Sequence, residues 1–546
     1  MKTRLLKWLG VLLIGLTGCY DYSSLDNIVI DRFTPEYVFP LLKSEITFKD
    51  LAEKEGTNSV VEQHPGSNMY FLAYRDTIDL GLATDLFPIS SVSFPDNTLD
   101  FGAALTPGFT SFGPITIPFN QAYTAIPGAE IKRVDFTGGI IRITLTNTFS
   151  HRIDASISLT SLKNSSGVTH PPINFSPLNA GQTLVRDVDL NGYYLDLLEL
   201  PNTYNNIKYS ATATITSSGN PSLLGNVTIG IAINSPEYQQ ITGKITYAYN
   251  HTDQPYSIGI FNSTILAEQH IAEPKFSLNF INSFGLPSNV NFTRLEVENI
   301  NGVIPITHEG PNNPGDLLIG SPNTLKNATP SKLCDTTKLV LTSSNSNIEN
   351  IFDVAPNSLS FGATFNIGDA ADPSHDYFVR NDSKFELQSE IEIPLKGWVV
   401  TNKIADTVLN VEWPDFKNDL NLTNQEFRIK FKFNNGLPLN MYLQIKFLDT
   451  NGALVTQLFD ADSEQLIKSS PVDPESGEST GKSLSYSYIA IDEAKYNQMA
   501  LSQDMIIIFK FTTGGTLHQN ITIQSSDAIA IEMSLEASGT VKPKPF

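Results

Sequence analysis

The chain has almost no cysteine. Only Cys19 and Cys334 occur in 546 residues. Cys19 lies in an N-terminal export motif described below, so Cys334 has no internal partner and the exported chain is expected to lack an internal disulfide. A lone cysteine can be a reactive thiol, but more often it is a small apolar residue packed beside a strand. We expect the second for Cys334.

Positive charge is also scarce. Lysine and arginine total 36 against 57 aspartate and glutamate, and the formal net charge is −21. No basic patch with interleaved aromatic residues occurs along the chain, so no nucleic-acid partner is expected. The acidic balance mainly favours solubility.

Motifs for metal, cofactor or catalytic chemistry are missing from the sequence. The eight histidines are scattered, without HExxH spacing. No glycine-rich phosphate loop and no GxSxG motif occurs. The acidic run at 460–464 could hold calcium, but it lacks the spacing and glycine of an EF-hand loop, so a solvated loop is favoured. We therefore expect no metal, no cofactor and no enzyme activity.

Four aromatic residues could stack on sugars, namely Trp398, Trp413, Tyr193 and Tyr194. Trp398 lies in a strand-like run, which favours packing in a core or at a domain junction over a sugar platform.

What the chain does have is an export signal. Lys2, Arg4 and Lys7 precede an apolar segment at 8–16 that is too short to span a bilayer. Leu16-Thr17-Gly18-Cys19 matches the lipobox of bacterial lipoproteins. That resemblance implies removal of residues 1–18 and acylation of Cys19, including palmitate, which is enough for stable anchoring. Tyr20 is not the aspartate that retains many lipoproteins in the inner membrane, so the resemblance implies the outer membrane.

A strand motif recurs three times. In each copy, a run of alternating apolar residues ends two positions before an Asn, and a large apolar residue stands two positions after that Asn. A second strand follows, and a glycine turn follows that strand. The copies are centred on Asn147, Asn282 and Asn435. The middle copy slips phase near 294–295, which indicates a bulge. Strands at 227–233, 385–393 and 528–535 are expected to close the copies, and short helices are expected at 193–198, 348–354 and 492–499.

The three Asn side chains point inward by this alternation. A buried amide must be hydrogen-bonded, so each is predicted to be a structural latch at a strand end. The alternative is a ligand-binding Asn in an exposed loop. Repetition in three copies favours the latch.

The fold predicted is all-β, with three tandem immunoglobulin-like β-sandwich domains after a lipidated N-terminal tether. The predicted boundaries are a signal peptide at 1–18, a tether at 19–56 and sandwiches at 57–245, 246–398 and 399–546. Strands at 70–74 and 89–94 are expected to join the first sandwich.

The repeats distantly resemble late-embryogenesis-abundant type 2 sandwiches, whose strand also ends at an Asn. The whole chain more closely resembles uncharacterised outer-membrane lipoproteins of the Bacteroidota, through the lipobox, the segment Thr34-Pro-Glu-Tyr-Val-Phe-Pro40 and the tandem Asn motifs. Many exported proteins of that phylum are O-glycosylated at Asp-Thr/Ser-apolar sites. By that resemblance, Thr77, Thr336 and Thr407 are candidate sites.

The function favoured by the sequence is a non-enzymatic outer-membrane lipoprotein, on the surface or facing the periplasm, with a structural or partner-binding role. Its membrane contact would be the lipid anchor, and its partner a protein at the outer membrane. Two alternatives remain: an accessory subunit of an outer-membrane barrel complex in assembly or nutrient uptake, and a glycan-binding surface lipoprotein. Exposed aromatic residues in one plane would favour the glycan.

Overall fold

The structure is a computed structural model, and nearly all of its regular structure is β-strand, which confirms the predicted all-β class. It describes residues 34–50, 60–99, 101, 105–199, 203–251, 255–258, 268–299, 301–307, 322–368, 376–400, 402–408, 413, 422–460 and 465–541. Cys19 lies outside these residues.

The chain forms two compact units, and its first and last segments belong to the same one. One unit is Met1–Glu55 together with Trp398–Phe546, and the other is Gly56–Gly397. The middle of the chain is thus an insertion between two parts of the first unit. The predicted division into three sandwiches stays a prediction.

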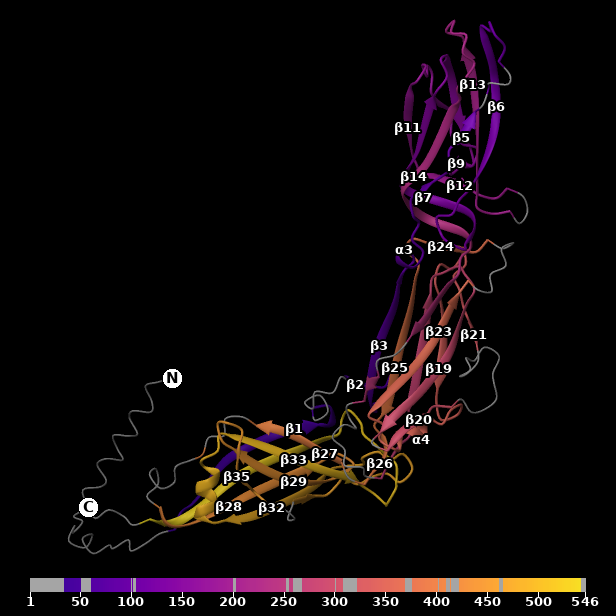
Figure 1. Ribbon diagram of the computed structural model, residues 1–546. Coiled ribbons are helices and arrows are strands. Elements are labelled where there is room, and N and C mark those ends of the chain that lie inside the picture. Colours follow the sequence, from indigo (N-terminus) through magenta and orange to yellow (C-terminus); the bar gives the residue numbers. More distant parts are fainter. Residues whose placement is uncertain are drawn as a thin grey trace, which may run out of the picture. The chain divides into compact units, whose positions relative to one another are not determined.

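The unit Gly56–Gly397 contains a sandwich built from the first Asn copy (Figure 1). One sheet has the order β10-β8-β13-β6, and the other β24-β14-β7-β12-β9, with β11 also on β7 and with β4 and β5 on β14. The strands are β4 (Val92–Ser93), β5 (Asn97–Leu99), β6 (Ser111–Ala122), β7 (Glu130–Asn147), β8 (Arg152–Ser158), β9 (Leu162–Asn164), β10 (Ile173–Asn174), β11 (Thr183–Asp189), β12 (Tyr193–Asp196), β13 (Asn206–Thr216), β14 (Val227–Lys244) and β24 (Phe378–Arg380).

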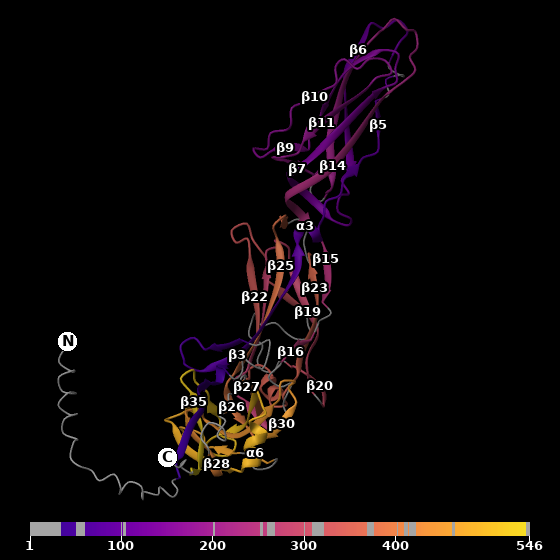
Figure 2. The ribbon, with the colours of Figure 1, turned by 90° about the vertical axis from the view of Figure 1, so that its left-hand side faces the viewer.

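The same unit contains a second pair of sheets around the second Asn copy (Figure 2). Their orders are β2-β3-β25-β18-β22 and β15-β23-β19-β20, with β16 on β23 and β21 on β19. The elements are β2 (Val60–Gln63), β3 (Tyr70–Leu82), α3 (Ala83–Leu86), β15 (Tyr247–His251), β16 (Tyr256–Ser257), β18 (Lys275–Asn282), β19 (Ser288–Asn299), β20 (Gly302–Pro305), β21 (Asn323–Leu325), β22 (Asp335–Leu341), α4 (Ile348–Phe352), β23 (Ser358–Ile367) and β25 (Lys384–Pro394).

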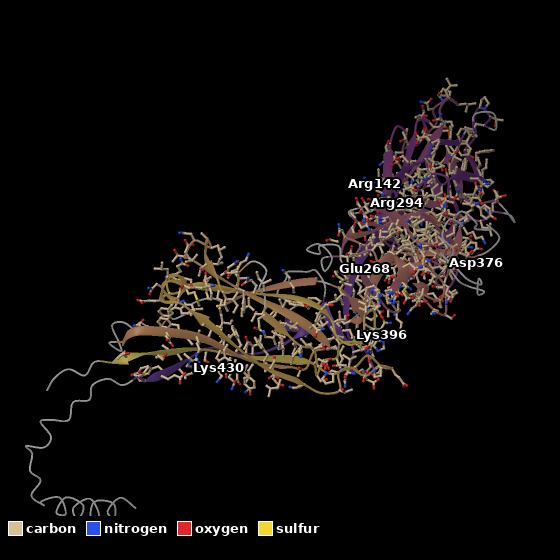
Figure 3. The ribbon with its side chains drawn as sticks, turned by 90° about the horizontal axis from the view of Figure 1, so that it is seen from below. Arg142, Glu268, Arg294, Asp376, Lys396 and Lys430 are labelled. Carbon is tan, nitrogen blue, oxygen red and sulfur yellow. The ribbon has the colours of Figure 1, made fainter. Side chains whose placement is uncertain are left out.

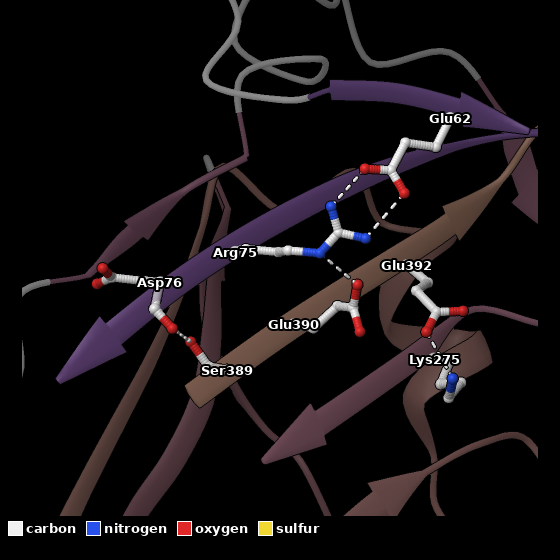
Figure 4. A network of polar contacts seen from close by, with 7 residues as sticks. All are labelled: Glu62, Arg75, Asp76, Lys275, Ser389, Glu390 and Glu392. Carbon is white, nitrogen blue, oxygen red and sulfur yellow. Dashed lines mark hydrogen bonds and ion pairs between the residues drawn. The ribbon is translucent and has the colours of Figure 1, made fainter. Parts of the chain in front are cut away.

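The expectation that residues 70–74 join the first sandwich was wrong. Strand β3 pairs with β25, beside the second Asn copy. Side-chain contacts of Arg75 on β3 accompany this pairing (Figure 4). The Arg75 guanidinium donates to both carboxylate oxygens of Glu62 on β2. It also donates to Glu390 Oε1 on β25, at 2.6 Å. These hydrogen bonds raise the pKa of Arg75 and lower that of Glu62. Sequence order alone favoured the nearer sandwich, because nothing local identifies a partner more than 300 residues away.

The other unit is built on the third Asn copy. Its sheets have the orders β1-β35-β28-β32 and β27-β33-β29-β30, with β31 also on β29. The elements are β1 (Glu36–Thr47), β27 (Asn402–Val408), β28 (Leu422–Asn435), β29 (Leu439–Leu448), β30 (Leu454–Gln457), β31 (Gln465–Ile467), β32 (Ser483–Ile491), α6 (Glu493–Met499), β33 (Asp504–Thr513) and β35 (Ala528–Val541). Further short strands are β17 (Gln269–Ile271), β26 (Lys396–Val399) and β34 (Ile521–Thr522).

The predicted tether at 19–56 was wrong for residues 36–47. These residues form β1, which pairs along its length with β35 near the other end of the chain. Pro40 does not interrupt this strand, because it lies at a register shift on a sheet edge, where a residue without an N–H is tolerated.

The repeated motif itself is confirmed at the level of strands. β7, β18 and β28 all end at their Asn, and β14, β25 and β35 close them by antiparallel pairing. The bulge in the middle copy is confirmed by a register shift between Phe292 and Arg294. The helix expected at 193–198 was wrong: Tyr193–Asp196 is strand β12, held by pairing to both β7 and β9.

Candidate functional site

The three motif asparagines are fully buried and hydrogen-bonded to backbone. Asn147 Nδ2 donates to the carbonyls of His151 at 2.8 Å, Leu178 at 3.2 Å and Asn179 at 3.1 Å, and its Oδ1 accepts from Phe149 N–H at 2.9 Å. One side chain thus ties the end of β7 to its own loop and to a second loop about thirty residues later.

Asn435 repeats this pattern in the other unit. Its Nδ2 donates to the carbonyls of Leu439 and Lys468, both at 2.9 Å, and its Oδ1 accepts from Leu437 N–H at 3.0 Å. The buried amide therefore satisfies three backbone groups where the strand ends.

Asn282 shares two features of this pattern: its Oδ1 accepts a backbone N–H, and its Nδ2 donates to one backbone carbonyl. Phe284 N–H donates to its Oδ1 at 2.9 Å, and its Nδ2 donates to Lys326 O at 3.0 Å and to Ser288 Oγ at 3.4 Å. None of the three amides is exposed to a ligand in solution.

A hollow of about 610 Å³, open to solvent, lies in the unit Gly56–Gly397. Four neighbouring strands set its floor. Cross-strand pairing aligns Asp196, Arg133, Thr242 and Phe378 in one row, and Tyr194, Asp135, Gln240 and Arg380 in the next. Directly opposed residues share a face of the sheet. The lining residues are Lys132, Arg133, Asp135, Asp196, Leu198, Gln239, Gln240, Thr242, Pro330, Asp376, Phe378 and Arg380.

Arg133 is held in this pocket by a carboxylate and an aromatic ring. Its Nε and Nη2 donate to the Asp135 carboxylate, with Nε 2.9 Å from Oδ2, and its guanidinium carbon lies 3.6 Å from the centre of the Tyr194 ring. The hydrogen bond to Asp135 raises the pKa of Arg133. The guanidinium therefore stays charged and fixed in direction.

The other charges of the pocket are also paired. Lys132 Nζ lies 3.0 Å from Asp376 Oδ1, and the Asp376 side chain is 83% exposed. Figure 3 labels Asp376. Arg380 donates to both oxygens of Asp382, at 2.9 and 3.0 Å. Lys163 Nζ lies 2.6 Å from Asp196 Oδ2, and this hydrogen bond raises the pKa of Lys163.

The pocket is therefore rich in both donors and acceptors while its charges nearly cancel. Guanidinium and ammonium groups donate, carboxylates accept, and the Gln239 and Gln240 amides can do both. A ligand dense in hydroxyl groups uses donors and acceptors together, and burying it here would strand no unpaired charge. The arrangement can hold a neutral, polyhydroxylated molecule.

The aromatic residues considered for sugar stacking do not form one platform. Tyr194 stacks under Arg133 beside the pocket, and Tyr193 lies 5.3 Å from His170 between ring centres. Trp398 stacks on His518 at 4.1 Å. Trp413 Nε1 donates to Ser502 Oγ at 3.3 Å. Of the four, only Tyr194 is connected to the pocket.

Sequence reasoning missed the pocket because its residues come from five separate segments. The only local signal was polar residues at outward positions of β7 and β14. Nothing in the sequence states that Arg133 lies opposite Thr242, since register depends on long-range pairing.

The remaining predicted positions are dispersed. Thr77 is exposed on β3, and Thr336 is half-buried on β22. Thr407 lies on β27, opposite Ile506, and its side chain is outside the described residues. Modification of these three stays a prediction.

The expectation that Cys334 is buried was wrong: it is exposed. The buried positions of β22 are Thr337, Leu339 and Leu341, so position 334 falls on the outward phase of the same alternation.

Among the residues that the structure describes, no group of three or more His, Cys, Asp or Glu side chains is placed to hold a metal ion. Within the same residues, no helix has the length and apolar character needed to cross a membrane.

No protein-family model matches the chain, and the comparison with curated proteins finds no match. Among solved structures, the chain is similar to a presumed secreted protein of Parabacteroides distasonis, with 11% identity over 92% of this chain and 99% of that one, at a TM-score of 0.29. A triple jelly roll protein of an archaeal virus aligns with 9% identity over 92% of this chain and 91% of that chain, at a TM-score of 0.09. Scores this low do not establish a shared fold.

Proposed function

We propose that this protein is a non-enzymatic, lipid-anchored protein of the bacterial outer membrane that binds a glycan in the pocket whose floor is formed by β12, β7, β14 and β24. The four aromatic residues considered for stacking form no common platform, so the glycan proposal rests on the balance of hydrogen-bond donors and acceptors around a hollow of about 610 Å³. The anchor is supported by Leu16-Thr17-Gly18-Cys19.

A binding role is supported by the state of the pocket carboxylates. Asp135, Asp196 and Asp376 are each held within 3.0 Å of a cationic nitrogen. Paired carboxylates suit hydrogen bonding to hydroxyl groups. A carboxyl group that donates a proton in catalysis is usually kept neutral by burial or by a second carboxylate.

Replacing Cys19 with serine tests the anchor. We expect the precursor to stay unprocessed, or the protein to leave the outer membrane, because the acyl chains supply the membrane affinity. Fractionation with metabolic palmitate labelling measures this, with Cys334→Ser as the matched control that keeps both label and location. Mature-sized Cys19→Ser protein that still fractionates with the outer membrane contradicts the anchor.

Replacing Arg380 with methionine tests the pocket. The purified full chain is applied to an oligosaccharide array, and hits are measured by calorimetry. We expect Arg380→Met to weaken binding about tenfold or more, because a hydrogen bond from a charged group contributes about 1.5–3 kcal/mol.

The matched control is Arg152→Met, which also removes an arginine paired with an aspartate two residues further along the chain, at 2.9 Å, but on β8 away from the pocket. It should bind as the parent chain does. Equal losses in both variants, or no oligosaccharide bound by the parent chain, would contradict the glycan role.

A further inference from the structure

Strand β32 is an unusually open sheet edge. It is the last strand of the order β1-β35-β28-β32, and among the described residues no strand pairs with its outer side. An edge strand presents unpaired N–H and C=O groups to any extended chain, so folded proteins normally protect long edges with proline, charge, bulges or short length.

Other edges of this protein carry such protection. β1 has Pro40 and a register shift, β6 has Pro114 and Pro118, and β20 is four residues long and ends at Pro305. β32 has none of these devices. Its nine residues, SLSYSYIAI, include no proline, glycine or charged residue, and its register with β28 is unbroken. That composition is typical of a strand that pairs readily.

The exposed face of β32 is apolar and aromatic. Leu484, Tyr486 and Tyr488 are 56%, 53% and 56% exposed and alternate along the strand. On neighbouring β28, Lys430 Nζ lies 5.4 Å from the centre of the Tyr488 ring (Figure 3 labels Lys430), and its charge is balanced by Glu536 at 3.7 Å. An apolar strip beside balanced charges can be approached by a copy of itself without local repulsion.

We propose that β32 pairs with β32 of a second copy of this chain, antiparallel and centred on Ser487, so that two four-stranded sheets become one continuous sheet. In this register Tyr486 lies opposite Tyr488 of the second copy, twice by symmetry. Aromatic cross-strand pairs are among the favourable ones in antiparallel sheets. An isologous contact of this kind closes on itself and makes a dimer rather than a filament.

Charge complementarity at the strand ends selects the second copy and this register. Lys482 precedes β32 and Asp492 follows it, and both are exposed. With Ser487 at the centre, Lys482 of each copy lies opposite Asp492 of the other. Moving the centre by one residue, to Tyr486, places Lys482 opposite Ala490 and loses both charge pairs. The contact involves neither the pocket nor the lipid anchor.

A cysteine placed at the two-fold centre tests the register. The full chain is used with Cys334→Ser, which removes the exposed native thiol, and that background without a further change is the blank. Opposed Cα atoms in an antiparallel pair lie about 4.5–5.5 Å apart, within disulfide range. We therefore expect Ser487→Cys to give a disulfide-linked dimer under mild oxidation.

The matched control is Ser485→Cys, on the same face of β32. In the proposed register the two copies of residue 485 are offset by four residues, about 13 Å, which is too far for a disulfide. Crosslinking at 485 but not 487, crosslinking at both alike, or crosslinking at neither overturns the proposal.

A second measurement does not depend on cysteine chemistry. Sedimentation velocity of the parent chain should show a monomer–dimer equilibrium, and Tyr486→Lys should weaken it at least tenfold by placing charge in the apolar strip. Tyr442→Lys, at an exposed tyrosine of β29, is the control and should dimerise normally. A parent chain that stays monomeric, or Tyr486→Lys and Tyr442→Lys that behave alike, overturns the proposal.

Discussion

Replacing Asn435 with alanine is expected to lower the free energy of unfolding of its unit by about 3 kcal/mol, because three backbone groups, two of them in buried hydrogen bonds, lose their partners at once. These are the carbonyls of Leu439 and Lys468 and the N–H of Leu437. Water cannot replace the amide, since Asn435 is fully buried. Chemical denaturation followed by tryptophan fluorescence measures the change.

Asn434→Ala is the matched control, since Asn434 precedes Asn435 on β28 and is not buried. It should change stability by less than about 0.5 kcal/mol, as most surface substitutions do. The unit Gly56–Gly397 should keep its own transition in both variants, because distant sites behave additively. This unit contains no tryptophan, so its transition is followed by circular dichroism. Unchanged unfolding of Asn435→Ala, together with weaker capture of a partner, would show that the motif loops are a binding surface instead.

Replacing Gly243 with alanine is expected to cost more than about 3 kcal/mol, because both backbone conformation and space exclude a side chain there. Gly243 has φ +147°, and an added Cβ would lie 2.3 Å from Glu130 O and 2.9 Å from Ile131 Cα, which are backbone atoms of the paired strand β7. Gly243 N–H also donates to Tyr377 O at 2.9 Å, which ties β14 to the segment entering β24. Because Gly243 adjoins Thr242 of the pocket lining, the substitution should also displace the pocket residues.

Gly128→Ala is the matched control, because it introduces the same kind of backbone strain as Gly243→Ala without a steric clash. Gly128 has φ +73°, but nothing lies within 4 Å of an added Cβ. It should cost only about 1 kcal/mol, the conformational penalty alone. Thermal unfolding of the two variants measures the difference, and similar melting temperatures would contradict the predicted collision with β7.

The regular part of the fold was predictable because alternation is local. Ile429, Phe431 and Phe433 alternate with lysines, and these three residues are buried on β28 as the pattern requires. The inward phase of Asn435 follows from the same count. Even the wrong expectation for Cys334 was recoverable in this way, since the phase of β22 places it outward.

The pocket and the edge were not predictable, because both depend on which strands are neighbours. β3 and β25 are separated by more than 300 residues, as are β1 and β35, and no local residue pattern distinguishes these partners from nearer strands. Tyr486 and Tyr488 have an alternation that fits any half-buried strand. That β32 ends its sheet, and so leaves them beside an open backbone edge, follows only from the strand order.

Strand identity, the face each residue takes and the export signal are contained in short stretches of chain, because side-chain direction alternates with every residue whatever the strand's partner. Register and strand order required the tertiary structure, because antiparallel pairing energy is nearly the same for many partners. A strand's partner is decided by the burial of whole sheet faces. The pairing of β7 with β14, which places Arg133 opposite Thr242, is one example.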